Sequence, residues 1–279
     1  IVSPSGFVSL IRKIDEKGIM EKFLDTATPK YLESIANSKY KGKVQTGELA
    51  TITSFSDFAF DHKGNMFISD RLNHQIRKVD SKGNITTIAG TGESGYYGDG
   101  GPASEAAFRD PSALATDKEG NLYIADGANN MIRKIDTNGI VSTIAGNGKH
   151  VNSGDGGPAL KASIRHMDYL KVSPQGELHI VGMNANTIRK ITKDGKMVVV
   201  AGNGYQGYSG DGGSATKAML KSPLAIAFDS KNNMYITDMG NNRIRKVDAK
   251  GTISTFAGTG NFGWAQDGET VEIYLHKFP

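Results

Sequence analysis

The groups best suited to chemistry in this sequence are charged residues that recur at a fixed interval. An aspartate inside the motif GDGG stands at Asp99, Asp155 and Asp211, each 56 residues after the last. A second aspartate recurs at Asp70, Asp126 and Asp238, and an arginine recurs at Arg77, Arg133 and Arg245. A carboxylate can ligate a cation, accept hydrogen bonds within a turn, or pair with a guanidinium.

The GDGG aspartates fit a turn better than a cation site. Calcium takes about six to eight oxygen ligands, and the DxDxDG pattern of established calcium loops is absent. An aspartate flanked by glycines instead accepts backbone N–H bonds, and a glycine such as Gly100 permits a positive φ. We predict that Asp99, Asp155 and Asp211 fix turns, with calcium as the alternative at these residues and no other cofactor.

The histidine and serine patterns do not indicate an active site. Catalytic histidines of a repeat protein would meet only from equivalent positions, yet the six histidines fall at six different positions of the interval. The chain has no cysteine and no GxSxG motif. No catalytic residue is predicted, and a lyase or hydrolase with a bound metal is the alternative function.

Three glycine-rich segments match the dinucleotide pattern GxGxxG, beginning at Gly90, Gly202 and Gly258. Each follows an expected strand. None precedes a helix whose N-terminus could face a pyrophosphate. These segments are therefore predicted to be turns.

A repeat that runs along the chain positions all of these groups. The sequence IRK followed by Ile or Val begins at Ile11, Ile76, Ile132, Ile188 and Ile244, and the last three steps are 56 residues each. One period reads as four strands, expected in one copy at 111–117, 122–126, 131–136 and 140–146. Because such a unit cannot bury both faces alone, we predict an all-β fold, a β-propeller of four-stranded antiparallel blades.

The pattern DxxGNLYIADxxNNxIRKID in residues 117–136, followed by TIAGxG and GDGGPA, resembles NHL repeats, in particular the extended bacterial kind related to teneurin-like surface proteins. The resemblance implies a propeller and no particular activity, since NHL propellers include protein binders, RNA binders and some lyases or hydrolases. One copy departs from the pattern, with Gly182 and Thr192 where the other copies have aspartate.

The repeat predicts one propeller over residues 1–279, cut from a longer chain. The blade units are expected near 1–26, 49–90, 106–148, 162–204 and 218–260, with a closing segment at 261–279. The ring has five blades if a strand beyond Pro279 completes the first blade. It has six if a further blade lies outside the sequence.

The arginines are expected to form ion pairs between blades. Adjacent residues of a strand point to opposite faces, so the arginine and lysine of each IRK unit face different neighbouring blades. The predicted interblade ion pairs use Asp70, Asp126, Asp238, Arg77, Arg133 and Arg245. An RNA-binding face would need aromatic residues between the basic ones, and this strand offers none, so nucleic acid is not an expected partner.

The predicted binding surface lies on the connectors between blades. In an antiparallel blade, these connectors leave from the same end as the links between second and third strands, so both are expected on one face, where binding usually occurs. Aromatic and histidine residues occupy corresponding stretches of successive connectors: Tyr96, Tyr97, His150, Tyr205, Tyr208, Phe262 and Trp264. We predict that they contact a protein or glycan, with folding back over the blade joints as the alternative.

Composition adds little about location. The 33 basic and 29 acidic residues are interleaved, and no window approaches the ~18 apolar residues of a membrane span. The first residues lack the features of a signal peptide. The compartment is not determined, although an extracellular or cell-surface location is favoured. The prediction is a monomeric, non-enzymatic binding or scaffold module of a bacterial exported or surface protein.

Overall fold

The computed structural model describes residues 10–14, 20–25 and 54–261. Within these residues the regular structure consists of β-strands and three-residue 3₁₀ turns. The strands form four sheets of four antiparallel strands and one sheet of two. The predicted all-β class and the four-stranded unit are confirmed.

The strand bounds follow the repeat. The two-stranded sheet contains β1 (Leu10–Ile14) and β2 (Met20–Asp25). The four complete sheets contain β3 (Phe55–Phe60), β4 (Met66–Asp70), β5 (Gln75–Val79) and β6 (Ile85–Ala89); β7 (Pro111–Thr116), β8 (Leu122–Asp126), β9 (Met131–Ile135) and β10 (Val141–Ala145); β11 (Tyr169–Val172), β12 (Leu178–Gly182), β13 (Thr187–Ile191) and β14 (Met197–Ala201); and β15 (Pro223–Phe228), β16 (Met234–Asp238), β17 (Arg243–Val247) and β18 (Ile253–Ala257). The 3₁₀ turns are η1 (Arg71–Asn73), η2 (Ala103–Glu105), η3 (Gly127–Asn129), η4 (Ala159–Lys161), η5 (Ala215–Lys217) and η6 (Met239–Asn241).

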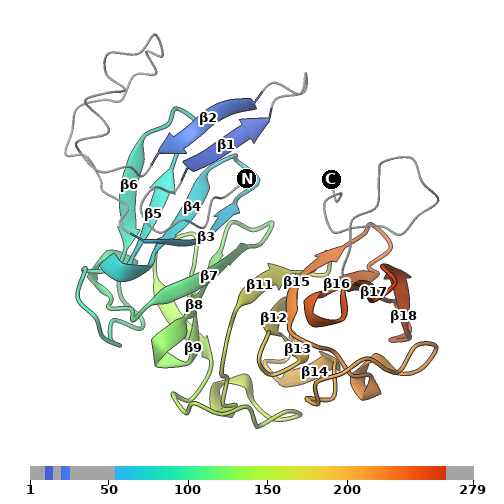
Figure 1. Cartoon of the computed structure of the whole chain (residues 1–279). Coiled ribbons are helices and arrows are strands. Elements are labelled where there is room, and N and C mark those ends of the chain that lie inside the picture. Colours follow the sequence, from blue (N-terminus) through green and yellow to red (C-terminus); the bar gives the residue numbers. More distant parts are fainter. Residues whose placement is uncertain (1–9, 15–19, 26–53, 262–279) are drawn as a thin grey trace.

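The four complete sheets are the blades of a β-propeller. Figure 1 shows them following one another along a curve, with β1 and β2 at one end and β15–β18 at the other. The first strands β3, β7, β11 and β15 contact one another in that order and form the inner side. The strands β6, β10, β14 and β18 form the outer edges.

The hydrophobic core lies between blades. One cluster joins Ala125 and Ile132 of the second complete blade with Leu170 and Ile180 of the third. Comparable clusters join the first blade to the second and the third to the fourth. Each sheet therefore buries its apolar faces only by packing on a neighbour, which is why the repeat has to be copied to be stable.

The GDGG segment of each connector covers the outer edge of the following blade. The N–H of Gly100 donates to the Val141 carbonyl (2.8 Å), and the N–H of Val141 donates to the Gly101 carbonyl (3.0 Å). Gly100 has the expected positive φ, 84°. The same two bonds recur between 156–157 and Met197, and between 212–213 and Ile253. The connector thus pairs with an outer strand that would otherwise expose unpaired backbone groups.

This path changes the predicted loop face. The first part of the connector does lie beside the link between second and third strands, since Asn129 Nδ2 donates to the Gly95 carbonyl (2.8 Å). The GDGG part, however, reaches the opposite end of the sheet, where the N–H of Ala103 donates to the Gly139 carbonyl (2.8 Å). Only the first part of each connector therefore shares a face with the links, because edge pairing carries the rest along the blade.

Candidate functional site

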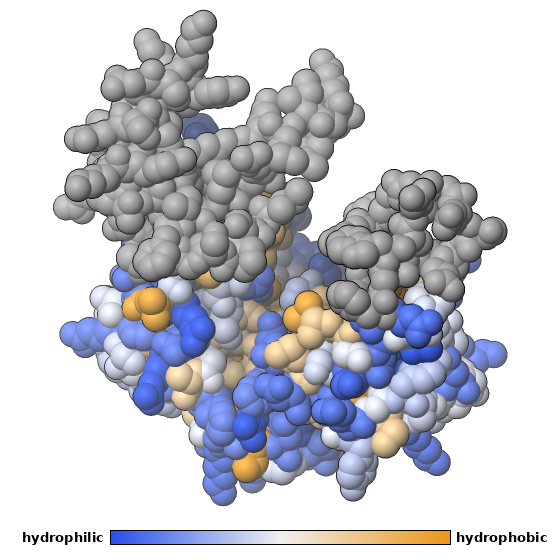
Figure 2. Space-filling model, viewed as in Figure 1, coloured by the Kyte–Doolittle hydropathy of each residue, from blue (hydrophilic) through white to orange (hydrophobic). Residues whose placement is uncertain are grey.

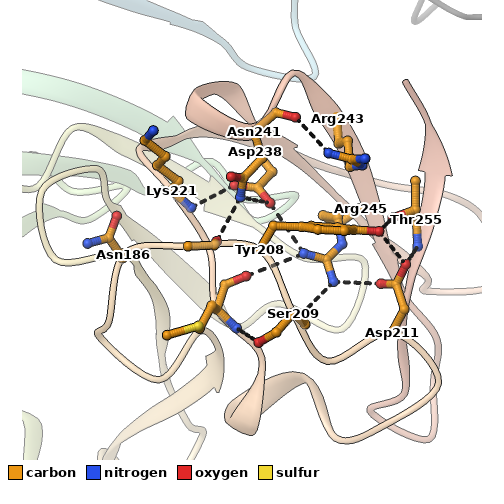
Figure 3. Close-up of polar contacts among 12 residues, drawn as sticks. Asn186, Tyr208, Ser209, Asp211, Lys221, Asp238, Asn241, Arg243, Arg245 and Thr255 are labelled. Carbon is orange, nitrogen blue, oxygen red and sulfur yellow. Dashed lines mark hydrogen bonds and ion pairs between the residues drawn. The ribbon is translucent and has the colours of Figure 1, made fainter. Parts of the chain in front are cut away.

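In each of the four complete blades, the strand-three arginine forms the centre of a polar cluster. In the last blade, Arg245 is completely buried, and its guanidinium lies between two aspartates (Figure 3). Its Nη1 is 3.3 Å from Asp238 Oδ2, and its Nη2 is 2.6 Å from Asp211 Oδ1. Nη2 also donates to the Ser209 carbonyl at 3.1 Å. The guanidinium therefore joins the blade to the connector that precedes it.

The second complete blade repeats this cluster. Arg133 Nη1 is 3.5 Å from Asp126 Oδ2, and Nη2 is 2.7 Å from Asp99 Oδ1. Nη1 and Nη2 also donate to the carbonyls of Ala107 and Tyr97, each at 3.2 Å. We call β7–β10 and β15–β18 the regular blades because both carry this full set.

The pairs of Asp126 with Arg133 and of Asp238 with Arg245 lie within one sheet, which corrects the predicted interblade position. Asp238 ends β16 and is opposite Arg243 on β17. Arg245 is two residues further along, so its side chain points to the same face as that of Arg243. Asp70 and Arg77 are joined in the same way within the first complete blade, 3.2 Å apart. These aspartates and arginines do form ion pairs, but strand order places both partners in one blade.

The second-strand aspartate also fixes the backbone where the connector arrives. Asp126 Oδ1 accepts the N–H of Arg109 (2.7 Å), and Oδ2 accepts Asn129 Nδ2 (2.9 Å). Burial raises the pKa of Asp126 to about 6, although the hydrogen bonds and the nearby Arg133 act in the opposite direction. Burial likewise raises the pKa of Asp238, whose Oδ1 accepts the N–H of Lys221 (2.7 Å).

The GDGG aspartate lies in a connector and bonds to residues of the blade that follows this connector. Asp211 accepts Arg245 Nη2 and the N–H of Thr255, the latter at 3.0 Å. Burial opposes ionisation of Asp211, but the bonds from Thr255 and Arg245 outweigh it and lower the pKa. A cation at Asp211 would compete with the guanidinium for the same oxygens. Among the described residues, no three His, Asp or Glu side chains lie close enough to hold a metal ion.

Two of the predicted partner-binding tyrosines cover these clusters. The Tyr208 ring lies over the guanidinium groups of Arg243 (3.9 Å) and Arg245 (4.9 Å), and its hydroxyl donates to Asp211 Oδ2 (3.0 Å). The hydroxyl is also 2.9 Å from Thr255 Oγ1. Tyr96 repeats this arrangement in the other regular blade, with its ring 5.0 Å from Arg133 and its hydroxyl 2.9 Å from Thr143 Oγ1. Both rings are partly exposed.

The other predicted contact residues occupy different settings. Tyr97 and Tyr205 are 48% and 71% exposed. His150 is exposed and lies 3.1 Å from Asn130 Oδ1 through its Nδ1. Phe262 and Trp264 lie outside the described residues. By the 56-residue period, Trp264 is the equivalent of Tyr96 and Tyr208, and Phe262 is the equivalent of His150, whereas Tyr97 and Tyr205 match none of the other predicted residues. The predicted residues therefore form no single ring of matched positions.

The blade β11–β14, which we call the divergent blade, keeps the arginine and loses much of its surroundings. Arg189 is buried and binds Asp155 through Nε (2.8 Å) and Nη2 (2.7 Å). Gly182 stands where the regular blades have the second aspartate. The equivalents of the tyrosine, the threonine and the link asparagine are Asn152, Val199 and Ala185.

Asn152 takes over the bonds of the missing carboxylate. Its Oδ1 accepts the N–H of Arg165 (2.9 Å), the donor equivalent to Arg109 and Lys221, which bond to aspartate in the regular blades. The same oxygen is 3.4 Å from Arg189 Nη1. Sequence reasoning missed Asn152, although its signal was visible: tyrosine and aspartate are replaced in the same copy of the repeat.

Comparison with known proteins agrees with the repeat pattern and the fold. The family model of the Teneurin NHL domain matches residues 91–154 and 203–269. Teneurin-m of Drosophila melanogaster is 32% identical over 222 residues, and Teneurin-3 of Mus musculus is 30% identical over 223. Each match covers 70% of this chain, whereas the chain spans 8% of the length of either relative.

Solved structures show the same fold at low identity. An auxiliary nutrient binding protein from Bacteroides ovatus superposes with a TM-score of 0.58 at 14% identity, over 90% of this chain and 52% of the other. Virginiamycin B lyase from Staphylococcus aureus superposes with a TM-score of 0.51 at 14% identity, over 93% and 69%. These similarities concern the fold alone. No helix in the described part of the chain has the length and apolar character needed to cross a membrane.

Proposed function

The chain belongs to the NHL-repeat family, and on this premise we propose that it is a non-enzymatic binding or scaffold module for a protein or glycan, within a bacterial exported or surface protein. The propeller is proposed to span residues 1–279. Its blades hold the connectors rigidly, and rigid connectors that present aromatic side chains suit recognition of a macromolecule.

The exposure of Tyr205 on a fixed turn is the observation that carries this proposal. The side chain is 71% exposed, while its backbone N–H donates to Asn203 Oδ1 (3.0 Å). The turn is held further by the N–H of Gly207, which donates to the Leu220 carbonyl (3.1 Å). A tyrosine on an ordered backbone loses little conformational entropy on binding, so more of its contact energy contributes to affinity.

A second exposed tyrosine has comparable support. Tyr97 is 48% exposed, and its carbonyl accepts the N–H of Ala107 at 3.3 Å. Hydrophilic residues predominate over the coloured part of the face in Figure 2, with hydrophobic residues among them. An aromatic anchor surrounded by polar groups is the usual composition of a binding site between soluble proteins.

Binding of the whole chain to arrays of secreted proteins, surface proteins and glycans tests the proposal. The double variant Tyr97→Ala/Tyr205→Ala is expected to lower the affinity for an identified partner at least about tenfold, the effect of losing two aromatic anchors. Phe256→Ala is the matched control, because Phe256 is 50% exposed and lies on strand β18, where its ring packs against Tyr235, and not on a connector. An identified partner that binds the double variant as tightly as the unchanged chain contradicts the proposed surface.

A further inference from the structure

The divergent blade contains a cavity at the place where the regular blades hold a tyrosine. Its volume is about 410 Å³, and its walls include Asn152, Asp155, Thr187, Arg189 and Val199. Four of these five residues are the repeat equivalents of the residues that contact Tyr208: Asp211, Arg243, Arg245 and Thr255. The fifth, Asn152, is the equivalent of Tyr208 itself.

The cavity is open because Asn152 points inward. Its Oδ1 is engaged by the N–H of Arg165 (2.9 Å) and by Arg189 Nη1 (3.4 Å). A side chain that makes these bonds cannot also cover the guanidinium from outside, as Tyr96 and Tyr208 do. The aspartate lost at Gly182 and the covering ring lost at Asn152 are therefore connected, because Asn152 makes the bonds of the aspartate instead of covering the guanidinium.

The walls keep the groups that recognise a phenol. Arg189 offers a guanidinium for stacking with an aromatic ring. Asp155 is 38% exposed, and although both of its oxygens bind Arg189, each carboxylate oxygen can accept a second hydrogen bond. Val199 replaces the threonine next to the hydroxyl, so Asp155 is the carboxylate acceptor for a phenol in this wall, which also contains Thr187, Asn203 and Thr216.

We propose that this cavity binds a tyrosine side chain of a partner protein. The ring lies on Arg189, and the phenolic hydroxyl donates to Asp155 Oδ2, as the hydroxyl of Tyr208 donates to Asp211 Oδ2 in the regular blade. Gly204 forms part of the wall and directly precedes the exposed Tyr205, so a partner that contacts Tyr205 reaches the cavity. The inference deepens the proposed function and rests on it only for the source of the tyrosine.

The first experiment titrates the chain with N-acetyl-L-tyrosinamide and follows arginine Nε–Hε and backbone amide resonances by NMR. Saturable shifts at Arg189 and at residues 152–155 and 202–204 are expected. The phenylalanine analogue lacks the hydroxyl and is expected to bind about tenfold more weakly. Absence of saturable shifts, or equal affinity for the two compounds, overturns the proposal.

Two variants locate the site. Val199→Tyr fills the cavity from β14 without altering Asn152 or Asp155, and it is expected to weaken the tyrosinamide at least about tenfold. If that variant does not fold, Thr187→Tyr fills the cavity from β13. Unchanged affinity in a folded variant overturns the assignment.

Tyr208→Ala is the matched variant in a regular blade. It removes the covering ring over Arg245 and is expected to create a second site, seen as new saturable shifts at Arg245 and residues 209–211. If this variant shows saturable shifts only at the Arg189 site, the absence of a covering tyrosine is not what creates the binding site, and the proposal is overturned. The probe is a free amino-acid derivative, so these outcomes are independent of the array experiment: tyrosinamide binding with no array partner contradicts the proposed function alone.

Discussion

The regular blades and the divergent blade bury the same arginine with different partners. Arg133 and Arg245 each lie between two carboxylates under a tyrosine ring. Arg189 has one carboxylate, Asp155, and the amide oxygen of Asn152. The blade retains its four strands despite this loss. The fold therefore does not require the second negative charge.

What all three blades retain is an acceptor for one backbone N–H. Asp126 and Asp238 accept the N–H of Arg109 and Lys221, and Asn152 accepts the N–H of Arg165. Losing the acceptor of a fully buried N–H costs about 1–3 kcal/mol. The bond at Arg165 is exposed and those at Arg109 and Lys221 are partly buried, so a neutral amide is an adequate replacement for a carboxylate there. The requirement that the three blades share is therefore a hydrogen-bond acceptor for this backbone N–H, and not a second ion pair with the arginine.

The Teneurin NHL model matches the regular blades and leaves out residues 155–202, which contain the strands of the divergent blade. This segment includes Gly182, Ala185 and Val199, three of the replaced positions. The match likewise leaves out residues 1–90, which contain the first complete blade.

Removing the arginine gives the largest expected effect and tests the comparison most directly. Arg133→Met should lower the free energy of unfolding by about 3–5 kcal/mol, because it leaves the buried Asp126 without its charge partner. Arg189→Met should cost less, about 1–3 kcal/mol, because water can solvate the partly exposed Asp155. Urea unfolding of both variants measures the difference. Equal losses would show that the second carboxylate does not distinguish the blades.

Replacing Asn152 should change the free energy of unfolding by a smaller amount. It tests whether Asn152 replaces the missing aspartate as the acceptor. Asn152→Ala should destabilise the chain by about 1 kcal/mol, the net value of one hydrogen bond, since the N–H of Arg165 loses its acceptor at an exposed position. Asn152→Asp is the control, because it keeps an acceptor oxygen and adds a charge facing Arg189. Urea midpoints should fall for the alanine variant and stay or rise for the aspartate variant. Two similar decreases would contradict the assigned role.

The pH dependence gives the smallest expected effect. The folded pKa of Asp126, about 6, lies above its ordinary value of 3.8, so the folded chain binds this proton more tightly than the unfolded chain. The free energy of unfolding should therefore fall as pH rises from about 4 to 6, on the order of 1 kcal/mol in total. Asp126→Asn should flatten this part of the profile, measured by urea unfolding at several pH values. A steeper decrease in the variant would reverse the assigned sign.

Much of the fold was predictable because each strand carries its own local signals. The four strands expected within 111–146 lie at β7–β10, with ends that differ by at most one residue. Less of the site was predictable. Arg133 and Asp126 are seven residues apart on adjacent strands, whereas Asp99 reaches the same guanidinium from 34 residues earlier through a connector that pairs with the outer strand. Local patterns do not contain such long-range pairings.

The sequence by itself determined the repeat, the propeller class and the charged residues that recur in each blade, because period, strand propensity and turn residues are local properties. Only the tertiary structure decided which carboxylate faces which arginine, that GDGG covers a sheet edge, and that Tyr96 and Tyr208 cover the arginines. It also decided that Asn152 points inward. Asn152 takes this orientation because its Oδ1 accepts the N–H of Arg165, which has no carboxylate acceptor in this blade. The two residues come within hydrogen-bonding distance only when the chain has folded.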